Sequence, residues 1–239
     1  MADELVARAA AISSRLQLVR DGRGGRLRVA AGAYIHDIAV QPAAIALIRN
    51  HPSVRLELLE REWTAVLRML MTDEVDLAVF DIDPLRRMPA LRIESLGPLA
   101  GTYFCRSGHP LLAKAVLQPA DLRAYPFVMP GMSNLHRDMI DLDPGLTLDA
   151  TSGTVLPSIA VSSFGNARDI VAETDAIGLG HASQLSTGIA QGRLAKLTLP
   201  WRAGPPTVEM GIAYKRERTL LPVARKFIGH VRRCMRAAA

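Results

Sequence analysis

The sequence predicts an α/β fold with two similar lobes that are joined by two crossings of the chain. The main observation is that strand-like and helix-like segments alternate from Arg26 to Asp81, within about 55 residues. A second alternation of the same kind follows the turn at residues 107–111. Such alternation is typical of parallel sheets covered by helices, which bind ligands at the carboxyl ends of their strands. We expect the two crossings near residues 101–103 and 203–207.

In the first half, continuous or alternating apolar runs predict strands, and apolar residues at helical spacing predict helices. The expected strands cover residues 27–31, 54–60, 75–80 and 91–99, and the expected helices cover about 37–50 and 63–71. In the first helix we expect Asp37 to be the cap. We expect Ile38, Ile45 and Ile48 to face inward from the same helix.

The second half repeats this pattern. Its expected strands cover residues 102–106, 125–129, 158–163, 176–180 and 194–199, and its expected helices cover about 135–142, 166–174 and 182–190. A strand at 208–214 and a helix at 221–235 are expected to return to the first sheet. Residues 3–20 carry a narrow apolar stripe at helical spacing, which predicts a coiled-coil connector followed by the flexible basic segment DGRGGR.

The composition is that of a folded globular protein. The 239 residues are 49% hydrophobic and 22% charged, and they suffice for one large domain or two ordinary ones. No apolar run approaches the roughly 20 residues of a membrane span. The start MADELVARA carries acid rather than a basic signal region, so we predict a cytoplasmic protein without a membrane partner. Cys105 and Cys234 lie far apart without a CxxC motif, so we expect two reduced thiols.

The net charge of +6 is concentrated at the two ends of the chain. Residues 1–28 carry six Arg against three acidic residues, and residues 215–239 carry eight Lys or Arg against one, which leaves −4 between them. A DNA-reading face should instead be a basic patch on a folded element. Aromatic residues make up only 5% of the chain, too few for a surface that stacks single-stranded nucleic acid. We expect no nucleic-acid channel in the body of the protein.

Motifs for catalysis and for cofactors are missing from the sequence. It contains no GxSxG elbow, no HExxH, no GxxxxGK[ST] and no Cys/His cluster with metal spacing. The spacing of Ser, His and Asp residues does not suggest a triad. The adjacent His36 and Asp37 are expected to have side chains that diverge. We therefore predict that the chain is not an enzyme and has no zinc, nucleotide or flavin site.

Four groups of phrases, in this order and spacing, carry a family likeness. They read GRLRVAAG…PAAIALIRNHPSVRLELLE…LMTDEVDLAVFD, then RSGHPLLAK…QPADLRAYPFV, then SFGNARDIVAETDAIGLGHAS, and finally GRLAKLTLP…GIAYKRERTLLPVARKFIGHVR. Over residues 26–232 the chain resembles the C-terminal effector-binding domain of LysR-type transcriptional regulators. The resemblance implies a two-lobed, periplasmic-binding-protein-like (type 2) fold, in which each lobe is a mixed sheet flanked by helices.

The resemblance also implies an organisation and partners. It places the end of a linker helix at residues 1–22, lobe I at 26–101 and 207–236, and lobe II at 102–206. The winged helix-turn-helix that usually precedes the linker is expected to be absent, so DNA would be bound only through that missing part. The family likeness implies a homodimer or homotetramer. In it, the helix at residues 37–50 of one copy would pack against the helix at residues 166–174 of another.

The predicted effector site lies where two helix starts, residues 34–37 and 164–166, face each other across the lobes. Free backbone N–H groups there could hold a small organic anion. The residues that we expect at the site are Ala33, Tyr34, Ile35, His36, Asp81, Gly131, Met132, Ser133, Phe164, Gly165, Asn166 and His181. For several of these residues, a purely structural role is the alternative to effector contact.

Four of these residues have a structural alternative. Ser133 and Asn166 could be helix caps, Phe164 could belong to the hydrophobic core, and Tyr34 could pack in the wall of the cleft without contacting the ligand. The family often has a Ser or Thr in the first strand–helix loop, where this chain has residues 33–36, AYIH. The leading interpretation of the whole is a domain that senses a small-molecule effector. The alternatives are a solute-binding protein of a transporter and, less favoured, a two-lobed α/β enzyme.

Overall fold

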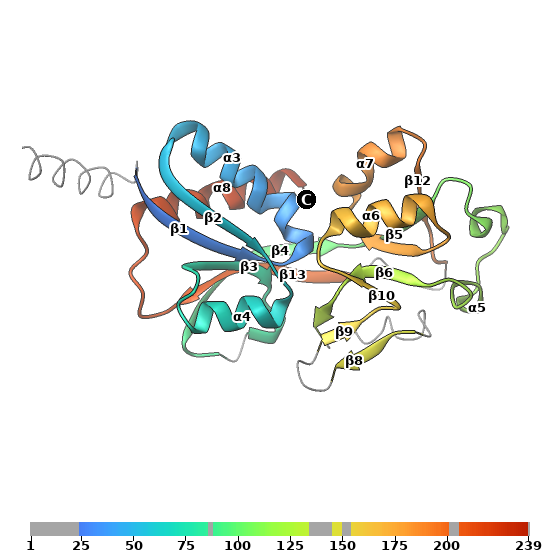
Figure 1. Ribbon diagram of the computed structural model, residues 1–239, viewed down its shortest axis with the longest axis horizontal. Coiled ribbons are helices and arrows are strands. Elements are labelled where there is room, and N and C mark those ends of the chain that lie inside the picture. Colours follow the sequence, from blue (N-terminus) through green and yellow to red (C-terminus); the bar gives the residue numbers. More distant parts are fainter. Residues whose placement is uncertain (1–23, 86–87, 134–144, 150–153, 201–205, 239) are drawn as a thin grey trace, which may run out of the picture.

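The computed structural model describes residues 24–85, 88–133, 145–149, 154–200 and 206–238, which form two lobes side by side (Figure 1). Each lobe contains one five-stranded mixed sheet with helices on its faces. The expected two-lobed α/β fold is therefore confirmed. The connector expected at residues 3–20 lies outside the described residues.

The sheet of lobe I has the strand order β2-β1-β3-β13-β4. Its strands are β1 (Gly24–Ala31), β2 (Ser53–Glu60), β3 (Leu77–Asp81), β4 (Leu91–Ala100) and β13 (Thr207–Lys215). β1 is parallel to β2 and β3, whereas β13 is antiparallel to β3 and β4. Helices α3 (Gln41–Asn50) and α8 (Pro222–Ala238) cover one face, and α4 (Trp63–Met71) covers the other (Figure 1). Buried apolar clusters lie on both faces of this sheet.

The sheet of lobe II has the order β10-β6-β11-β5-β12. Its strands are β5 (Thr102–Arg106), β6 (Phe127–Pro130), β10 (Ile159–Val161), β11 (Ile177–Gly180) and β12 (Leu194–Leu197). The helices are α5 (Pro119–Leu122), α6 (Phe164–Glu173) and α7 (Ala182–Ala190), with a 3₁₀ turn at Pro110–Ala113. A small third sheet, β7-β9-β8, is formed by Met132–Ser133, Thr154–Leu156 and Thr147–Asp149.

The chain passes between the lobes from β4 to β5 and again from β12 to β13. The two passages touch where the backbone N–H of Gly101 donates to the carbonyl of Pro206 at 2.7 Å. A Cβ at Gly101 would lie 2.9 Å from Cδ1 of Leu179 and 3.1 Å from Cγ of Pro206, so a larger residue would require these side chains to shift. We retain residues 26–101 with 207–236, and 102–206, as our proposed division into lobes.

The first helix differs from its prediction. It begins earlier, with α2 (Ala33–Ile35), and continues through a π-helical turn (His36–Val40) into α3. Its N-cap is Gly32, and Asp37 lies inside the helix rather than at its cap. The wide π-turn inserts an extra residue, so the positions that follow it face a different direction.

The inward face of this helix changes accordingly. Ile38 is buried as expected, but Ile45 is 49% exposed and Ile48 is 37% exposed. The buried residues of α3 are instead Ala43, Ala44 and Leu47, and the two alanines are small enough to let α3 lie close to α8. Two isoleucines are thereby left on the outer surface of lobe I.

Other expectations need smaller corrections. α6 begins at Phe164, two residues before its predicted start, because Ser163 is its N-cap. The helix expected at 135–142 lies outside the described residues, and Met132–Ser133 just before it is strand β7. None of the described helices is both long enough and apolar enough to span a membrane. Cys105 and Cys234 are not paired, and burial raises the pKa of the Cys105 thiol to about 12, so it stays protonated.

Candidate functional site between the lobes

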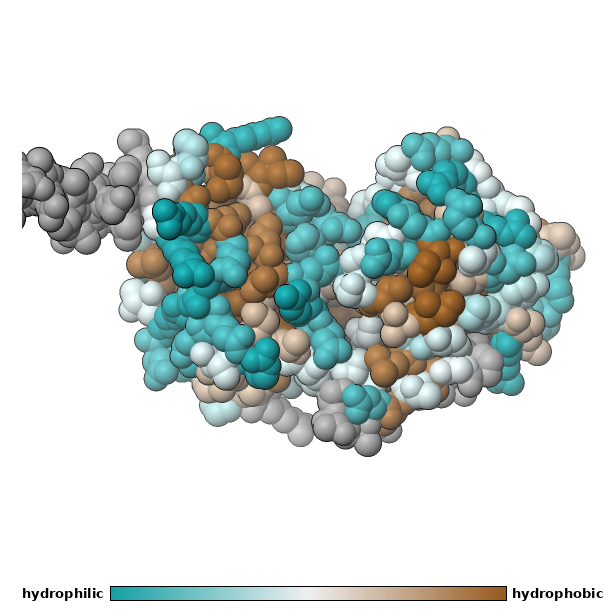
Figure 2. Space-filling view, in the orientation of Figure 1, coloured by the Kyte–Doolittle hydropathy of each residue, from teal (hydrophilic) through white to brown (hydrophobic). Residues whose placement is uncertain are grey.

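A cavity of about 410 Å³ lies between the lobes, at the carboxyl ends of β1, β2 and β3 in lobe I and of β6 and β10 in lobe II. Its volume is within the usual range for small-molecule sites. Its lining is formed by residues 32–35, 60–63, 80–81, 130–131, 156, 160–162, 208 and 210. The hollow between the lobes is visible on the surface, where its lobe I rim is mainly hydrophilic (Figure 2).

Tyr34 joins the two lobes at the base of the cavity. It packs against apolar clusters of both lobes, and its ring centroid lies 6.2 Å from that of Phe164 in lobe II. Its carbonyl accepts a hydrogen bond from Nε2 of Gln184 at 3.4 Å. The hydroxyl is buried, and none of the described residues is its hydrogen-bond partner. Burial raises the pKa of Tyr34 well above its ordinary value. A change in lobe angle must therefore disturb the surroundings of Tyr34.

Glu60 lines the cavity where β2 ends, and a small charged cluster lies behind it. Oε2 of Glu60 is 3.8 Å from Nδ1 of His36, and the same nitrogen is 3.1 Å from Oδ1 of Asp37. The prediction that the side chains of His36 and Asp37 diverge is wrong, because the helical backbone there lets the ring fold back onto its neighbour. The hydrogen bond with Asp37 raises the pKa of His36, while burial raises the pKa of Glu60.

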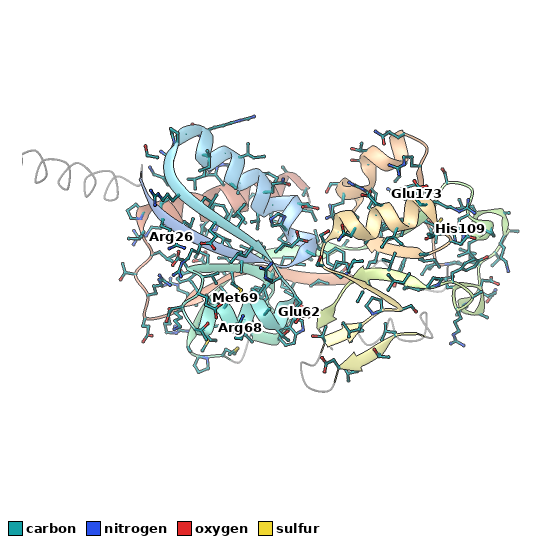
Figure 3. All side chains as sticks on the ribbon, in the orientation of Figure 1. Arg26, Glu62, Arg68, Met69, His109 and Glu173 are labelled. Carbon is teal, nitrogen blue, oxygen red and sulfur yellow. The ribbon has the colours of Figure 1, made fainter. Side chains whose placement is uncertain are left out.

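Residues 61–63, which follow Glu60, also line the lobe I side of the cavity. The Arg61 guanidinium donates to the carbonyl of Glu60 at 2.7 Å, and a carboxylate oxygen of Glu62 accepts from the Thr64 hydroxyl at 3.0 Å. Glu62 stands at the edge of lobe I that faces lobe II (Figure 3). Nε1 of Trp63 is buried and has no hydrogen-bond partner among the residues that the structure describes. This wall therefore combines acidic groups with a large aromatic surface.

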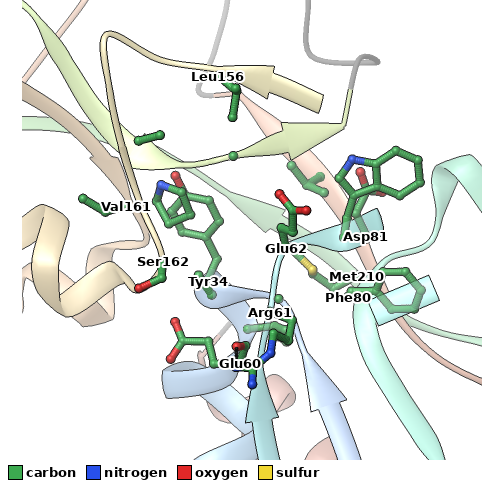
Figure 4. Close-up of a pocket in the computed structure, with 18 residues that line it drawn as sticks. Tyr34, Glu60, Arg61, Glu62, Phe80, Asp81, Leu156, Val161, Ser162 and Met210 are labelled. Atoms are coloured by element: carbon green, nitrogen blue, oxygen red, sulfur yellow. Dashed lines mark hydrogen bonds between the residues drawn. The ribbon is translucent and has the colours of Figure 1, made fainter. Parts of the chain in front are cut away.

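Lobe II contributes a mostly apolar wall, with Leu156, Val161 and Ser162 facing the lobe I residues across the cavity (Figure 4). A Cβ at Gly131 would lie 2.9 Å from Cγ2 of Thr154, so a larger residue where β6 leaves the sheet would require that side chain to shift. Ser162 comes directly before Ser163, whose hydroxyl accepts from the N–H of Asn166 at 3.2 Å. At least one of the helix-start amides expected to bind an anion is thus already occupied.

Comparison with known proteins decides the family. A model of the LysR substrate binding domain matches residues 20–236, which is nearly the whole chain. The chain belongs to the LysR substrate-binding domain family. Among curated proteins, the SDS degradation transcriptional activation protein of a Pseudomonas strain is 31% identical over 207 residues, or 86% of this chain. The chain spans 65% of the length of that relative.

Solved structures of LysR regulators share the fold. One match is the regulatory domain of MetR from N. meningitidis in a cysteine-substituted form. It has a TM-score of 0.64 and 17% identity, over 89% of this chain and 96% of that one. A full-length OxyR variant from Pseudomonas aeruginosa matches with a TM-score of 0.65 and 19% identity, over 98% of this chain and 81% of that one. At these identities the likeness concerns the fold alone.

Five of the twelve residues predicted for the effector site line the cavity of this LysR domain. They are Ala33, Tyr34, Ile35, Asp81 and Gly131. This places them at the candidate site, and their role in binding stays a prediction. Oδ1 of Asp81 accepts from the N–H of Asp83 at 3.0 Å, so part of this carboxylate shapes its own loop.

The other predicted residues lie elsewhere. His36 is behind Glu60, and Phe164 is core, as its 1% exposure shows. Gly165 lines a second, more open groove on the side of α3 and α7, and Asn166 is held by the cap of α6. His181 caps α7, where its Nδ1 accepts from the N–H of Ser183 at 3.3 Å. The side chains of Met132 and Ser133 lie outside the described part of the chain.

The prediction missed the remaining lining residues, which are 32, 60–63, 80, 130, 156, 160–162, 208 and 210. Sequence reasoning used two helix starts and some strand ends, but not the carboxyl end of the expected strand at 54–60, which pointed equally to residues 60–63. Val208 and Met210 had no such signal, because β13 runs antiparallel to its neighbours and brings its first residues to the cavity.

Proposed function

We propose that this chain is the effector-sensing part of a LysR-type transcriptional regulator, and that a small molecule binds in the cavity of about 410 Å³ between the lobes. The observation that supports this most is that the cavity has walls from both lobes. A molecule bound there contacts both lobes at once, so its affinity depends on the angle between them. The name of the curated relative supports a role in transcription, while the family offers no support for a transporter protein or an enzyme.

The proposed mechanism is a shift in population between lobe arrangements. The passages near Gly101 and Pro206 form the hinge, and Tyr34 lies between the lobes beside the cavity. An effector that favours one arrangement would stabilise it by the difference in its affinity for the two. The change in lobe arrangement would then reach the DNA-binding domain of the regulator.

Oligomerisation follows from the same proposal. Ile45 and Ile48 lie one helical turn apart on α3 and expose apolar surface that a contact with another copy would cover. We expect α3 of one copy to pack against α6 of another in a homodimer, or within a homotetramer, in the cytoplasm. Light scattering should then show a dimer or larger assembly at micromolar concentration, and charged substitutions of both isoleucines should yield monomer.

The sensing function is tested by filling the cavity. Ala160→Trp places an indole in the lobe II wall, and Leu112→Trp, on an exposed 3₁₀ turn elsewhere in lobe II, is the control. A thermal-shift screen of small organic molecules should find stabilisers of the native chain and of the control. A ligand present at 100 times its Kd stabilises by about 2.7 kcal/mol. For a chain of this size that is a rise of about 5–10 °C in Tm.

The two variants make the result specific. Every stabiliser that binds between the lobes should lose its effect in Ala160→Trp and keep it in Leu112→Trp. If stabilisers act equally on both variants, they bind elsewhere and the proposed site is wrong.

A further inference from the structure

Given the proposed function, we infer that the effector is an organic cation: an amine whose ammonium group contacts Glu60 and whose apolar body fills the rest of the cavity. This class replaces the anion that the helix starts suggested from the sequence. Three features favour it: the charge of the described lining residues, the carboxylates near the helix start at Ala33, and the surroundings of Glu60.

The first argument is charge. Among the described residues that line the cavity, three carry a carboxylate, Glu60, Glu62 and Asp81, and one carries a guanidinium, Arg61. The Arg61 side chain is exposed and donates to a backbone carbonyl. Figure 4 shows Glu62 reaching toward Leu156, whereas Arg61 lies beside Glu60. An anion in the cavity would therefore meet more negative than positive charge, which disfavours its binding.

The second argument concerns the helix start at Ala33. A helix start attracts negative charge, and this is the usual reason to expect an anion there. No side chain caps this start, but two carboxylates of the chain lie near it. Asp37 lies in the first turns of the helix, and Oε2 of Glu60 lies 3.8 Å from Nδ1 of His36 in the same segment. These carboxylates weaken the attraction of the helix start for a ligand anion.

The third argument is the state of Glu60. Its side chain is 23% exposed, and among the described residues its one cationic neighbour within 4.0 Å is His36. A carboxylate that is partly removed from water gains more from a new cation than a fully solvated one does. An ammonium group has three N–H donors, of which Glu60 can accept one or two and the Ser162 hydroxyl, on the opposite wall, another.

The remaining surface suits the body of such a molecule. Phe80 and Met210 are almost fully buried, and Trp63, Val161 and Leu156 extend the apolar lining. The faces of Phe80 and Trp63 also attract cations. An amine attached to a ring or short chain would bury its apolar part against these residues while its head remained at the carboxylates.

Three probes of nearly equal shape separate charge from fit. They are 2-phenylethylamine, 2-phenylethanol and 3-phenylpropionate, and their binding to the full chain is measured by calorimetry at millimolar concentration. The amine should bind most tightly, the alcohol less tightly, and the carboxylate least. Glu60→Gln should weaken the amine at least tenfold, which corresponds to about 1.4 kcal/mol, and should leave the alcohol unchanged.

Glu57→Gln is the matched control, because Glu57 lies on the same strand but pairs with Arg26 on the exposed surface. It should bind all three probes as the native chain does. Tighter binding of the carboxylate than of the amine, or an amine affinity unchanged in Glu60→Gln, overturns the inference. If the alcohol binds and Ala160→Trp abolishes its binding, the proposed sensing site stands even then. If no probe binds the native chain, both the inference and the proposed site are contradicted.

Discussion

Removing the Tyr34 hydroxyl is expected to stabilise the protein, which is opposite to the usual effect of changing a buried residue. The hydroxyl is buried and makes no hydrogen bond within the described part of the chain. A buried polar group without a partner costs about 1–3 kcal/mol. Tyr34→Phe deletes that group and keeps the ring that packs against Phe164. We therefore expect the free energy of unfolding to rise by about 1 kcal/mol, the lower end of this range.

Tyr214→Phe provides a control of opposite sign in the same chain. The Tyr214 hydroxyl donates to Oε1 of Glu94 at 2.8 Å, and the residue is 7% exposed. Its loss should lower the free energy of unfolding by roughly 1–2 kcal/mol, since the acceptor is charged and loses its donor. Urea unfolding of both variants and the native chain, with equal m values, gives the two differences directly.

The pH dependence supplies a second measurement on the same variant. Burial raises the pKa of Tyr34 above the ordinary value of 10.0. Above pH 10 the unfolded chain can ionise this group while the folded chain keeps it neutral, so the folded state loses stability as the pH rises. Tyr34→Phe should lack this part of the loss. If Tyr34→Phe instead destabilises the protein as much as Tyr214→Phe does, the hydroxyl has a partner and the reasoning fails.

Three further outcomes are expected. Asp76→Ala should lower the free energy of unfolding by about 3–5 kcal/mol, measured in urea. The Asp76 carboxylate is only 13% exposed and accepts hydrogen bonds from both the N–H and the guanidinium of Arg28. A loss below about 1 kcal/mol would contradict a structural role for this carboxylate. The raised pKa of His36 stabilises the folded state below its ordinary pKa of 6.5, and this stabilisation is lost as the pH rises. In His36→Gln this ionisable group is absent, so the Tm of the variant should fall less from pH 6 to pH 8 than the Tm of the native chain. His181→Ala should lower the free energy of unfolding by about 1 kcal/mol, because the cap of α7 is lost. The variant should bind the cavity probes as the native chain does, whereas weaker binding in calorimetry would indicate contact with the effector.

The fold was accessible from the sequence because hydrophobic periodicity reports directly on which elements pack against a sheet. The apolar run that became β3 and the stripe that became α8 could each be identified in this way. The π-turn at His36–Val40 could not, since nothing in residues 33–40 distinguishes an extra residue in a turn from an ordinary helix start. That single turn changed the inward face of α3 and left Ile45 and Ile48 exposed.

The site was only partly accessible, for a related reason. Strand ends pointed to Ala33, Asp81 and Gly131, because parallel strands bring their carboxyl ends to one edge. Helix starts were less informative. The starts of α6 and α7 already carry capping side chains, Ser163 and His181, which occupy groups that a ligand would need. A free helix start has to be identified from its cap as well as from its position.

The position of Tyr34 explains how one cavity could control the arrangement of two lobes. Tyr34 belongs to the lobe I wall, but it contacts two residues of lobe II. Its ring lies beside that of Phe164, and its carbonyl accepts a hydrogen bond from Gln184. A ligand between the walls would either keep these contacts or break them, and only a ligand that changes their free energy can shift the population. Because the ring of Tyr34 packs against apolar clusters of both lobes, breaking the contacts costs free energy. An effector that opens the lobes must offset this cost, whereas one that keeps the contacts stabilises the arrangement in which they form.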